Sequence, residues 1–217
     1  MKQLISDYGW QFIASYGVSL RISCIAFVLG LLLGTVLTVG RISPIPPLRE
    51  AINIYVETFR NIPVLALLVF IVYALPDLGL VIDYEPCVII SLILVSSAFT
   101  CDNLRTGINT IDAQQIQAAR ALGLNFSTIV TSIILPQALS SVIQPMVTLF
   151  ISVVISSSTG SLVPLAHEEL TGLVTEINNK EAMGVVTFFL ASILYVLTGL
   201  IIAFVGRRLE KRYALWR

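Results

Sequence analysis

Residue types that carry out catalysis or bind metals are scarce in this 217-residue chain, and they are not grouped. His167 is the single histidine, and the three cysteines, at positions 24, 87 and 101, do not have the spacing of a zinc site. No G-x-x-x-x-G-K-[ST] sequence is present, so the chain has no phosphate-binding loop for ATP. We therefore expect a non-catalytic protein that holds neither a metal nor a cofactor.

The polar residues that stand out lie inside or beside long apolar stretches. One apolar stretch ends in four consecutive hydroxyl side chains, Ser156, Ser157, Ser158 and Thr159. Such a run can line a path for a polar solute, or its hydroxyls can bond to carbonyls of their own helix and pack against a neighbour. Asp102, beside another apolar stretch, can face a polar cavity or pair with Arg105, and the spacing favours the pair.

A third feature is the segment DAQQIQAARALGLNFSTIVTSIILP, residues 112–136. Asp112 followed by Gln115 predicts a capping box that opens a short helix, and Gly123 is placed to end it. Ser127 is placed to cap a second short helix. A helix this short cannot cross a membrane, so it either docks on a partner or lies on the membrane surface as a connector. The residues alone leave both roles open.

The elements that position these residues must be membrane-spanning helices. Hydrophobic residues make up 56% of the chain and charged residues only 12%, and the mean hydropathy is +0.91. A soluble domain carries roughly twice as much charge. The formal net charge of zero leaves no basic excess for nucleic acid, and three cysteines are too few for a disulfide scaffold.

Stretches free of charged residues predict five spans, because about 20 apolar residues cross a bilayer. The stretches are residues 22–40, 61–76, 86–101 and 182–206, with the second and third extended at their cytoplasmic ends. A longer stretch, 121–166, would be more than twice the bilayer thickness as one helix, so it must break. Glycines and prolines in it leave one span between Pro136 and about Ser158. Residues before the first span are expected to form a short amphipathic lead-in that is retained.

The distribution of positive charge predicts the orientation of these spans. Ten of the 13 lysines and arginines fall on one side, in the first and third loops and the C-terminal tail. Because positive residues concentrate in cytoplasmic loops, we expect the N-terminus outside and the C-terminus in the cytoplasm.

The short helix carries a motif that marks a known family. Its spacing matches E-A-A-x3-G-x9-I-x-L-P, a motif of the membrane subunits of bacterial ABC importers. The stretches QAARALGLNF and IILPQAL, together with FRNIP and AFTCDNLRTGINTI, resemble the polar amino-acid permeases of the histidine/glutamine/glutamate type. The resemblance covers most of the chain. It implies a multi-pass protein of the bacterial plasma membrane.

The resemblance also implies a mechanism and partners. The short helix would be a coupling helix that docks on a cytoplasmic ABC ATPase dimer, through Gln117, Ala118, Ala119, Gly123, Leu135 and Pro136. ATP and Mg would be bound by that ATPase. A second permease subunit, the same or related, and an extracytoplasmic amino-acid-binding protein would complete the importer. The chain departs from the family at Gln117, usually Glu, and in the fourth span, where Lys-Asp-Thr-Ser is usual and Ser156 to Thr159 stand instead.

Taken together, the sequence predicts an all-α membrane protein of about five spans, with residues 1–217 forming a single transmembrane domain. The predicted function is that of a permease subunit of an ATP-driven importer for a polar amino acid, either glutamate- or glutamine-like or basic. The candidate residues of the substrate path are Asp102, Ser156, Ser157, Ser158 and Thr159. The alternative is a self-sufficient channel or secondary carrier, which would need an ion-coupling carboxylate deep within a span.

Overall fold

The computed structural model describes residues 2–129, 132–133 and 135–213, and within these ranges the chain is helical with no strand. The helices in chain order are α1 (Lys2–Arg41), α2 (Pro46–Asn61), α3 (Val64–Val69), α4 (Leu75–Asp77), α5 (Tyr84–Asn109), α6 (Ala113–Ala121), α7 (Phe126–Ile129), α8 (Leu135–Ser156), α9 (Leu170–Glu181) and α10 (Gly184–Tyr213). A π-helical turn, Phe70–Ala74, joins α3 to α4, and a 3-10 helix, Ser157–Leu162, follows α8. The predicted all-α class is confirmed.

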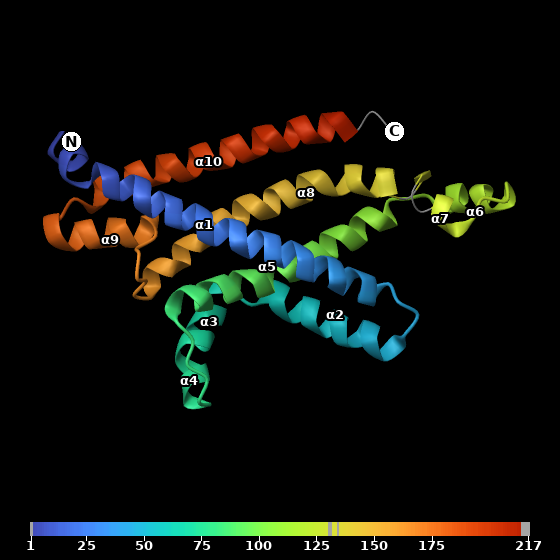
Figure 1. Cartoon of the computed structure of the whole chain (residues 1–217), viewed down its shortest axis with the longest axis horizontal. Helices are drawn as coiled ribbons and strands as arrows, with labels where there is room; N and C mark the ends of the chain where they lie inside the picture. The colour runs from blue at the N-terminus through green and yellow to red at the C-terminus, as the bar shows by residue number, and fades with distance from the viewer. Residues whose placement is uncertain (1, 130–131, 134, 214–217) are drawn as a thin grey trace.

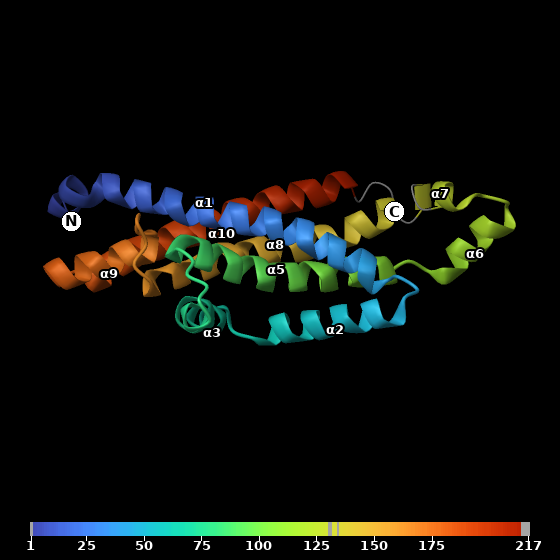
Figure 2. The same cartoon turned by 60° about the horizontal axis from the view of Figure 1, so that its bottom comes forward.

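Four long helices, α1, α5, α8 and α10, run along one axis and form the bundle (Figure 1). The N-terminus and α9 lie at one end of this bundle, while α6 and α7 project beyond the other end (Figures 1 and 2). Each of the four contains a span long and apolar enough to cross a membrane. A fifth span arises if the bent pair α2 and α3–α4 is counted as one, which agrees with the predicted number.

α1 is a single helix of 40 residues, about 60 Å long at 1.5 Å per residue. The expected lead-in is therefore continuous with the first span. Phe12 of this lead-in is buried in an apolar cluster with Leu170, Leu173 and Ile177 of α9. The segment before the span packs on protein because α9 supplies an apolar face there.

Two glycines let α1 approach α5 closely. A Cβ atom at Gly34 would lie 2.5 Å from Cβ of Thr100 and 2.6 Å from the carbonyl oxygen of Ser97. Gly30, one turn earlier, faces Ser96 in the same way. The G-x-x-x-G sequence therefore brings two spans of one chain into contact, as small residues commonly do in membranes.

The predicted second span is broken. α2 ends at Asn61, α3 begins at Val64, and the two segments bend by 104°. Pro63 lacks the N–H that a continuing helix needs, and it holds Ile62 in the extended region, at φ −84° and ψ 126°. The sequence showed this proline, but the apolar stretch around it concealed the break.

The long stretch 121–166 breaks as predicted. α6 ends at Ala121, and the fourth span runs from Leu135 to Ser156, with Pro145 inside the helix. Its C-terminal end tightens into the 3-10 helix Ser157–Leu162 before the chain turns into α9.

Candidate functional site

A polar-lined cavity lies between α2, α3, α5 and α8, with a volume of about 730 Å³. Its apolar wall includes Leu92, Val95, Phe99 and Val153. Its polar lining comprises Arg60, Ser96, Asn103, Gln144, Thr148, Ser152 and Ser156. The break at Pro63 and the proline inside α8 both border this space. The cavity thus combines apolar walls with a few polar groups, as small-molecule sites do.

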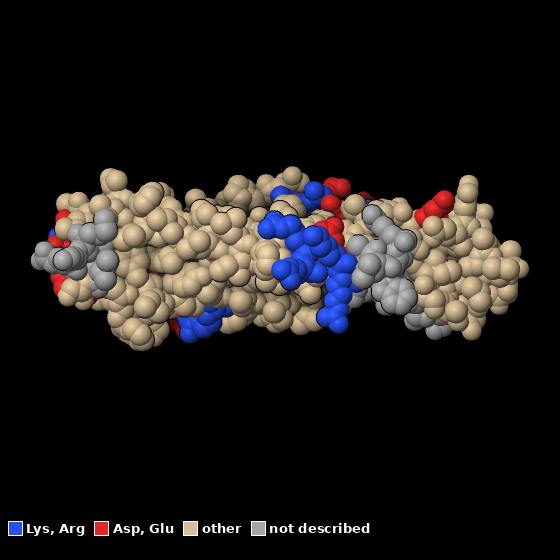
Figure 3. All heavy atoms as spheres, turned by 90° about the horizontal axis from the view of Figure 1, so that it is seen from above, with Lys and Arg blue, Asp and Glu red and all other residues tan. Residues whose placement is uncertain are grey.

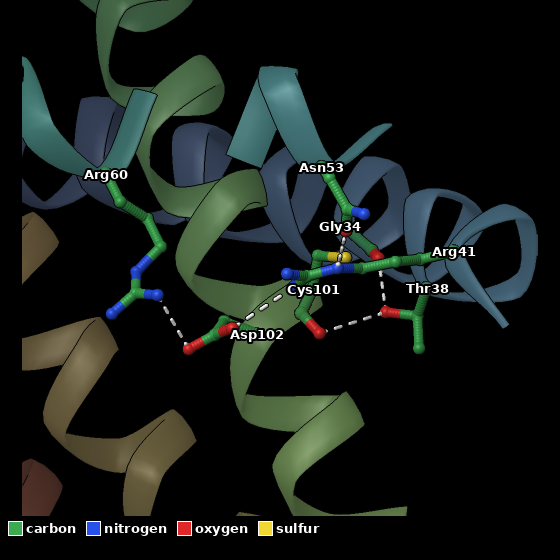
Figure 4. Close-up of polar contacts among 7 residues, drawn as sticks. All are labelled: Gly34, Thr38, Arg41, Asn53, Arg60, Cys101 and Asp102. Atoms are coloured by element: carbon green, nitrogen blue, oxygen red, sulfur yellow. Dashed lines mark hydrogen bonds and ion pairs between the residues drawn. The ribbon is translucent and has the colours of Figure 1, made fainter. Parts of the chain in front are cut away.

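Asp102 lies beside this cavity and binds two arginines (Figure 4). Its Oδ2 accepts from Nη1 of Arg60 at 2.9 Å, and its Oδ1 accepts from Nη1 of Arg41 at 3.2 Å. The predicted Asp102–Arg105 pair is therefore wrong. Arg105 lies one helical turn after Asp102 on the same helix, α5. The observed partners instead come from α1 and α2, two helices that pack on α5.

The two arginines differ in their surroundings. Arg41 is only 8% exposed, and its Nε also donates to Oδ1 of Asn53 at 2.8 Å. Arg60 is 40% exposed, lines the cavity, and lies 5.4 Å from the ring centroid of Phe99. Two guanidinium groups against one carboxylate leave one excess positive charge, and the arginine on the cavity side is Arg60. This charge can attract the carboxylate of a solute.

The structure separates the four predicted hydroxyls. Ser156 lines the cavity. Ser157 is buried and its Oγ donates to the carbonyl oxygen of Val154, while Oγ1 of Thr159 donates to that of Ser156. The carbonyl oxygen of Ser158 accepts from Oγ of Ser161. Ser156 thus lines the cavity, whereas Asp102 contacts it only through its partner Arg60. The other three hydroxyl residues belong to the 3-10 helix that follows α8.

Sequence reasoning missed most of the cavity lining. Gln144, Thr148 and Ser152 recur every four residues along α8, so one helical face carries them toward the cavity. That period was readable in the sequence. Their meeting with Arg60 and Asn103 was not, because it depends on how α2 and α5 pack on α8.

The helix α6 begins and ends as the sequence predicts. Asp112 is the N-cap, and its Oδ1 accepts from the backbone N–H of Gln114 at 2.8 Å. Gly123 has φ +78°, its N–H donates to the carbonyl oxygen of Arg120, and the N–H of Leu124 donates to that of Ala119. This pair of bonds is a Schellman motif, which fixes the turn after the helix.

Two details of this segment differ from the prediction. Gln115 does not close a capping box, because its Oε1 accepts from Nε2 of Gln137 at 2.9 Å and so ties α6 to the start of α8. The second short helix, α7, is capped by Asn125, whose Oδ1 accepts from the N–H of Thr128. The side chain of Ser127 lies outside the described residues.

The predicted docking residues do not all share one surface. Gln117, Ala118 and Gly123 are exposed on the projecting segment, together with Leu122, which is 81% exposed. Ala119 is buried, at 3% exposed. The side chains of Leu135 and Pro136 lie outside the described residues. The exposed part of the motif is therefore Gln117, Ala118 and Gly123, with Leu122 beside them.

A buried carboxylate that sequence reasoning missed lies at the other end of the bundle. Glu169, fully buried, is the N-cap of α9 and accepts from the backbone N–H groups of Thr171 and Gly172. Ser19 of α1 and Tyr195 of α10 also donate to it. Burial raises the pKa of Glu169, and these hydrogen bonds oppose the rise. Three helices therefore meet at this side chain.

The comparisons with known proteins agree with this fold. Residues 26–215 match the family described as "Binding-protein-dependent transport system inner membrane component". The chain belongs to this family. It is therefore a membrane-spanning transport component of a multi-pass kind, with several apolar helices.

Particular relatives and solved structures are similar over nearly the whole chain. A probable glutamine ABC transporter permease protein of Bacillus subtilis is 32% identical over 90% of both chains. A glutamate transport system permease protein of Corynebacterium efficiens is 30% identical over 91% of this chain and 92% of its own. A chain from the crystal structure of an amino acid ABC transporter with histidines has a TM-score of 0.89 at 24% identity, covering 96% of each chain. A chain of the inward-facing MetNI methionine ABC transporter has a TM-score of 0.68 at 25% identity, covering 98% and 97%.

Proposed function

We propose that this chain is the permease subunit of an ATP-driven importer for a polar amino acid, and that the cavity beside Arg60 is part of its substrate path. The observation that carries the proposal is the excess positive charge of the Arg41–Asp102–Arg60 cluster at a cavity whose described lining has no other charged side chain. Every amino acid carries an α-carboxylate, which Arg60 can bind while Phe99 and Val153 contact the side chain. The names of the relatives, glutamine and glutamate permeases, support this class of substrate.

The remaining polar groups indicate a substrate with hydrogen-bonding capacity. Asn103, Gln144 and Thr148 supply neutral donors and acceptors, and Arg60 is the only charged residue among the described lining residues. The carboxylate of Glu210 accepts from Nε2 of Gln144 at 2.6 Å. Both oxygens of Asp102 are already bound by arginines, so Asp102 is not available to pair with a positively charged substrate side chain. A substrate with an acidic or amide side chain therefore fits this cavity better than a basic amino acid.

We propose that a second permease subunit packs against this chain and completes the substrate path. The projecting tip of α6, with Gln117, Ala118 and Leu122 exposed, is proposed as the contact with one subunit of an ATPase dimer that binds ATP and Mg. An extracytoplasmic binding protein would deliver the amino acid at the end that carries α9. In this arrangement the N-terminus lies outside and the C-terminus in the cytoplasm.

The test is uptake of a radiolabelled amino-acid panel by proteoliposomes that contain the permease, its ATPase and its binding protein. We expect ATP-dependent uptake of glutamate or glutamine, strongly reduced by Arg60→Gln. Arg49→Gln, which removes an exposed arginine of α2 away from the cavity, is the matched control and should transport normally. Uptake by the permease alone, driven by an ion gradient, would favour a secondary carrier and reject the proposal.

A further inference from the structure

An apolar groove separates α1 from α10 on the side of the bundle away from the polar cavity. It has a volume of about 470 Å³ and is lined by thirteen residues without charge, among them Phe27, Leu104, Met146, Val205 and Leu209. A smaller space of about 190 Å³, between α1, α5 and α8, shares Leu104 and Val142 with it. The two spaces are therefore parts of one groove, and its shape and composition suit a hydrocarbon chain.

A cluster of basic residues stands where the groove meets the end of α10. Arg207, Arg208, Lys211 and Arg212 are all exposed in the last turns of α10. Figure 3 shows a patch of positive side chains beside a largely uncharged surface. The helical period connects this patch to the groove. Ile201, Val205 and Leu209 line the groove, so positions 208 and 212 continue the same face by one turn.

The one acidic residue in this turn is directed elsewhere. Glu210 accepts from Nε2 of Gln144 at 2.6 Å, and Gln144 lines the polar cavity on the other side of α8. None of the ion pairs found within the described residues involves the four basic side chains. Arg208 instead lies 4.9 Å from the ring centroid of Phe204, which keeps its guanidinium next to the exposed apolar face of α10.

We propose that this groove and the basic cluster bind one anionic phospholipid of the membrane. An acyl chain occupies the groove between α1 and α10, and its phosphate lies among Arg208, Lys211 and Arg212. The charge selects the occupant, because clusters of basic residues next to a span attract anionic lipid headgroups. A zwitterionic lipid offers the same chain without net charge.

A second copy of the chain suits this surface less well. A two-fold interface places the same patch of both copies near the symmetry axis, so two groups of four cations would approach each other without acidic partners. The polar cavity shares no lining residue with this groove.

The test uses the complete importer in proteoliposomes that contain phosphatidylglycerol with a photoreactive group in one acyl chain. Parallel samples contain phosphatidylcholine with the same photoreactive chain, and the labelled peptides are mapped by mass spectrometry. We expect labelling within residues 142–150 and 201–209, at least about fivefold stronger from phosphatidylglycerol, since each basic residue near an anionic surface contributes about that factor.

Variants separate the contributions of charge and groove. Arg208→Glu should abolish the preference for phosphatidylglycerol, and Arg208→Gln should weaken it. Arg49→Glu, which makes the same charge reversal on α2 outside the groove, should leave the preference for phosphatidylglycerol unchanged. Val205→Trp fills the groove but keeps the charges, and should lower labelling by both lipids. Equal labelling by the two lipids, or cross-linking of residues 207–212 to the ATPase or to a second permease copy in place of lipid, would overturn the proposal.

Discussion

At the scale of single residues, Asp102 forms ion pairs with two arginines that differ in their exposure. Arg41 is nearly buried, so its charged guanidinium is stabilised by Asp102 and Asn53 in place of water. Arg60 reaches water and the cavity. The same carboxylate therefore stabilises the fold through one partner and orients a binding group through the other.

We predict that Asp102→Asn destabilises the protein more than Arg60→Gln does. Removing one partner of a buried ion pair leaves an uncompensated charge and costs on the order of 3 kcal/mol. Arg60→Gln leaves no unpaired buried charge, because Asp102 still forms its ion pair with Arg41. Thermal unfolding of the detergent-solubilised protein, followed by circular dichroism, measures both. Equal Tm values for the two variants would contradict this account of Arg41.

Glu169 predicts a dependence of stability on pH. Because burial raises its pKa in the folded protein, the folded state binds the proton more tightly than the unfolded state. The resulting stability is fully present below the unfolded pKa and is lost as the pH rises through the folded pKa. The loss is about 1.4 kcal/mol for each pH unit between the two values.

Measurement of Tm from pH 4 to 7 should show this loss in the unaltered chain and a flatter profile for Glu169→Gln. Glu176→Gln is the control, because Glu176 is on the same helix but 42% exposed and paired with Lys180. A profile for Glu169→Gln as steep as that of the unaltered chain would assign the pH dependence to other groups.

At the scale of elements, the close packing of α1 on α5 requires glycine at position 34, whereas position 17 of the same helix has room for a larger residue. Gly34→Ala places a methyl group 2.6 Å from a backbone oxygen of α5, and such overpacking costs about 1–3 kcal/mol. Gly17, in the same helix, has no atom within 4 Å of an added Cβ. We predict a lower Tm for Gly34→Ala and an equal or higher Tm for Gly17→Ala, because alanine is the better helix former.

The turn after α6 provides a second prediction about an element. Gly123→Val should uncouple ATP hydrolysis from transport, because a β-branched residue at φ +78° is strained by about 1–2 kcal/mol and changes the direction of α6, the helix proposed to dock on the ATPase. Gly79→Val is the matched control, with φ +82° and equally open space, at a turn far from α6. Membrane insertion should be the same for both.

The readout is ATP hydrolysis by the reconstituted importer, with and without loaded binding protein. With loaded binding protein, ATP hydrolysis by the Gly123→Val importer should stay at the basal rate. ATP hydrolysis by the Gly79→Val importer should still be stimulated by the binding protein. Normal stimulation by Gly123→Val would mean that α6 is a connector on the membrane surface.

Local features of the sequence predicted the structure better than contacts between helices did. The N-cap at Asp112, the turn at Gly123 and the break near Pro136 each depend on a few neighbouring residues. Arg41, a partner of Asp102, lies 61 residues from it, and Ser19, a partner of Glu169, lies 150 residues from it, on helices whose rotation and depth a single sequence does not specify. The charge of Asp102 beside an apolar stretch predicted that it has a partner, but the partner chosen from sequence spacing, Arg105, was wrong.

At the scale of the whole molecule, the two ends of the bundle carry different elements. Lys180 of α9 lies at the end with the N-terminus, and Asp112 lies beside α6 at the opposite end (Figure 1). We predict that a cysteine at Lys180 reacts with an impermeant maleimide added to sealed cells, and that one at Asp112 reacts only after permeabilisation. The three native cysteines are first replaced by alanine. Reaction at Asp112 in sealed cells would reverse the proposed orientation.

The length of α1 has a mechanical consequence. Gly34 presses this rigid rod against α5, about 7 residues from Arg41 and about 22 residues from Phe12, or roughly 10 and 33 Å at 1.5 Å per residue. Along this length α1 is held on α5 at several levels, by the ion pair of Arg21 with Glu85, by Gly30 against Ser96, and by the ion pair of Arg41 with Asp102. A continuous helix fixed to its neighbour in this way is expected to move with it as one rigid body, so that a shift at the arginine cluster is transmitted to Phe12, where α1 packs on α9.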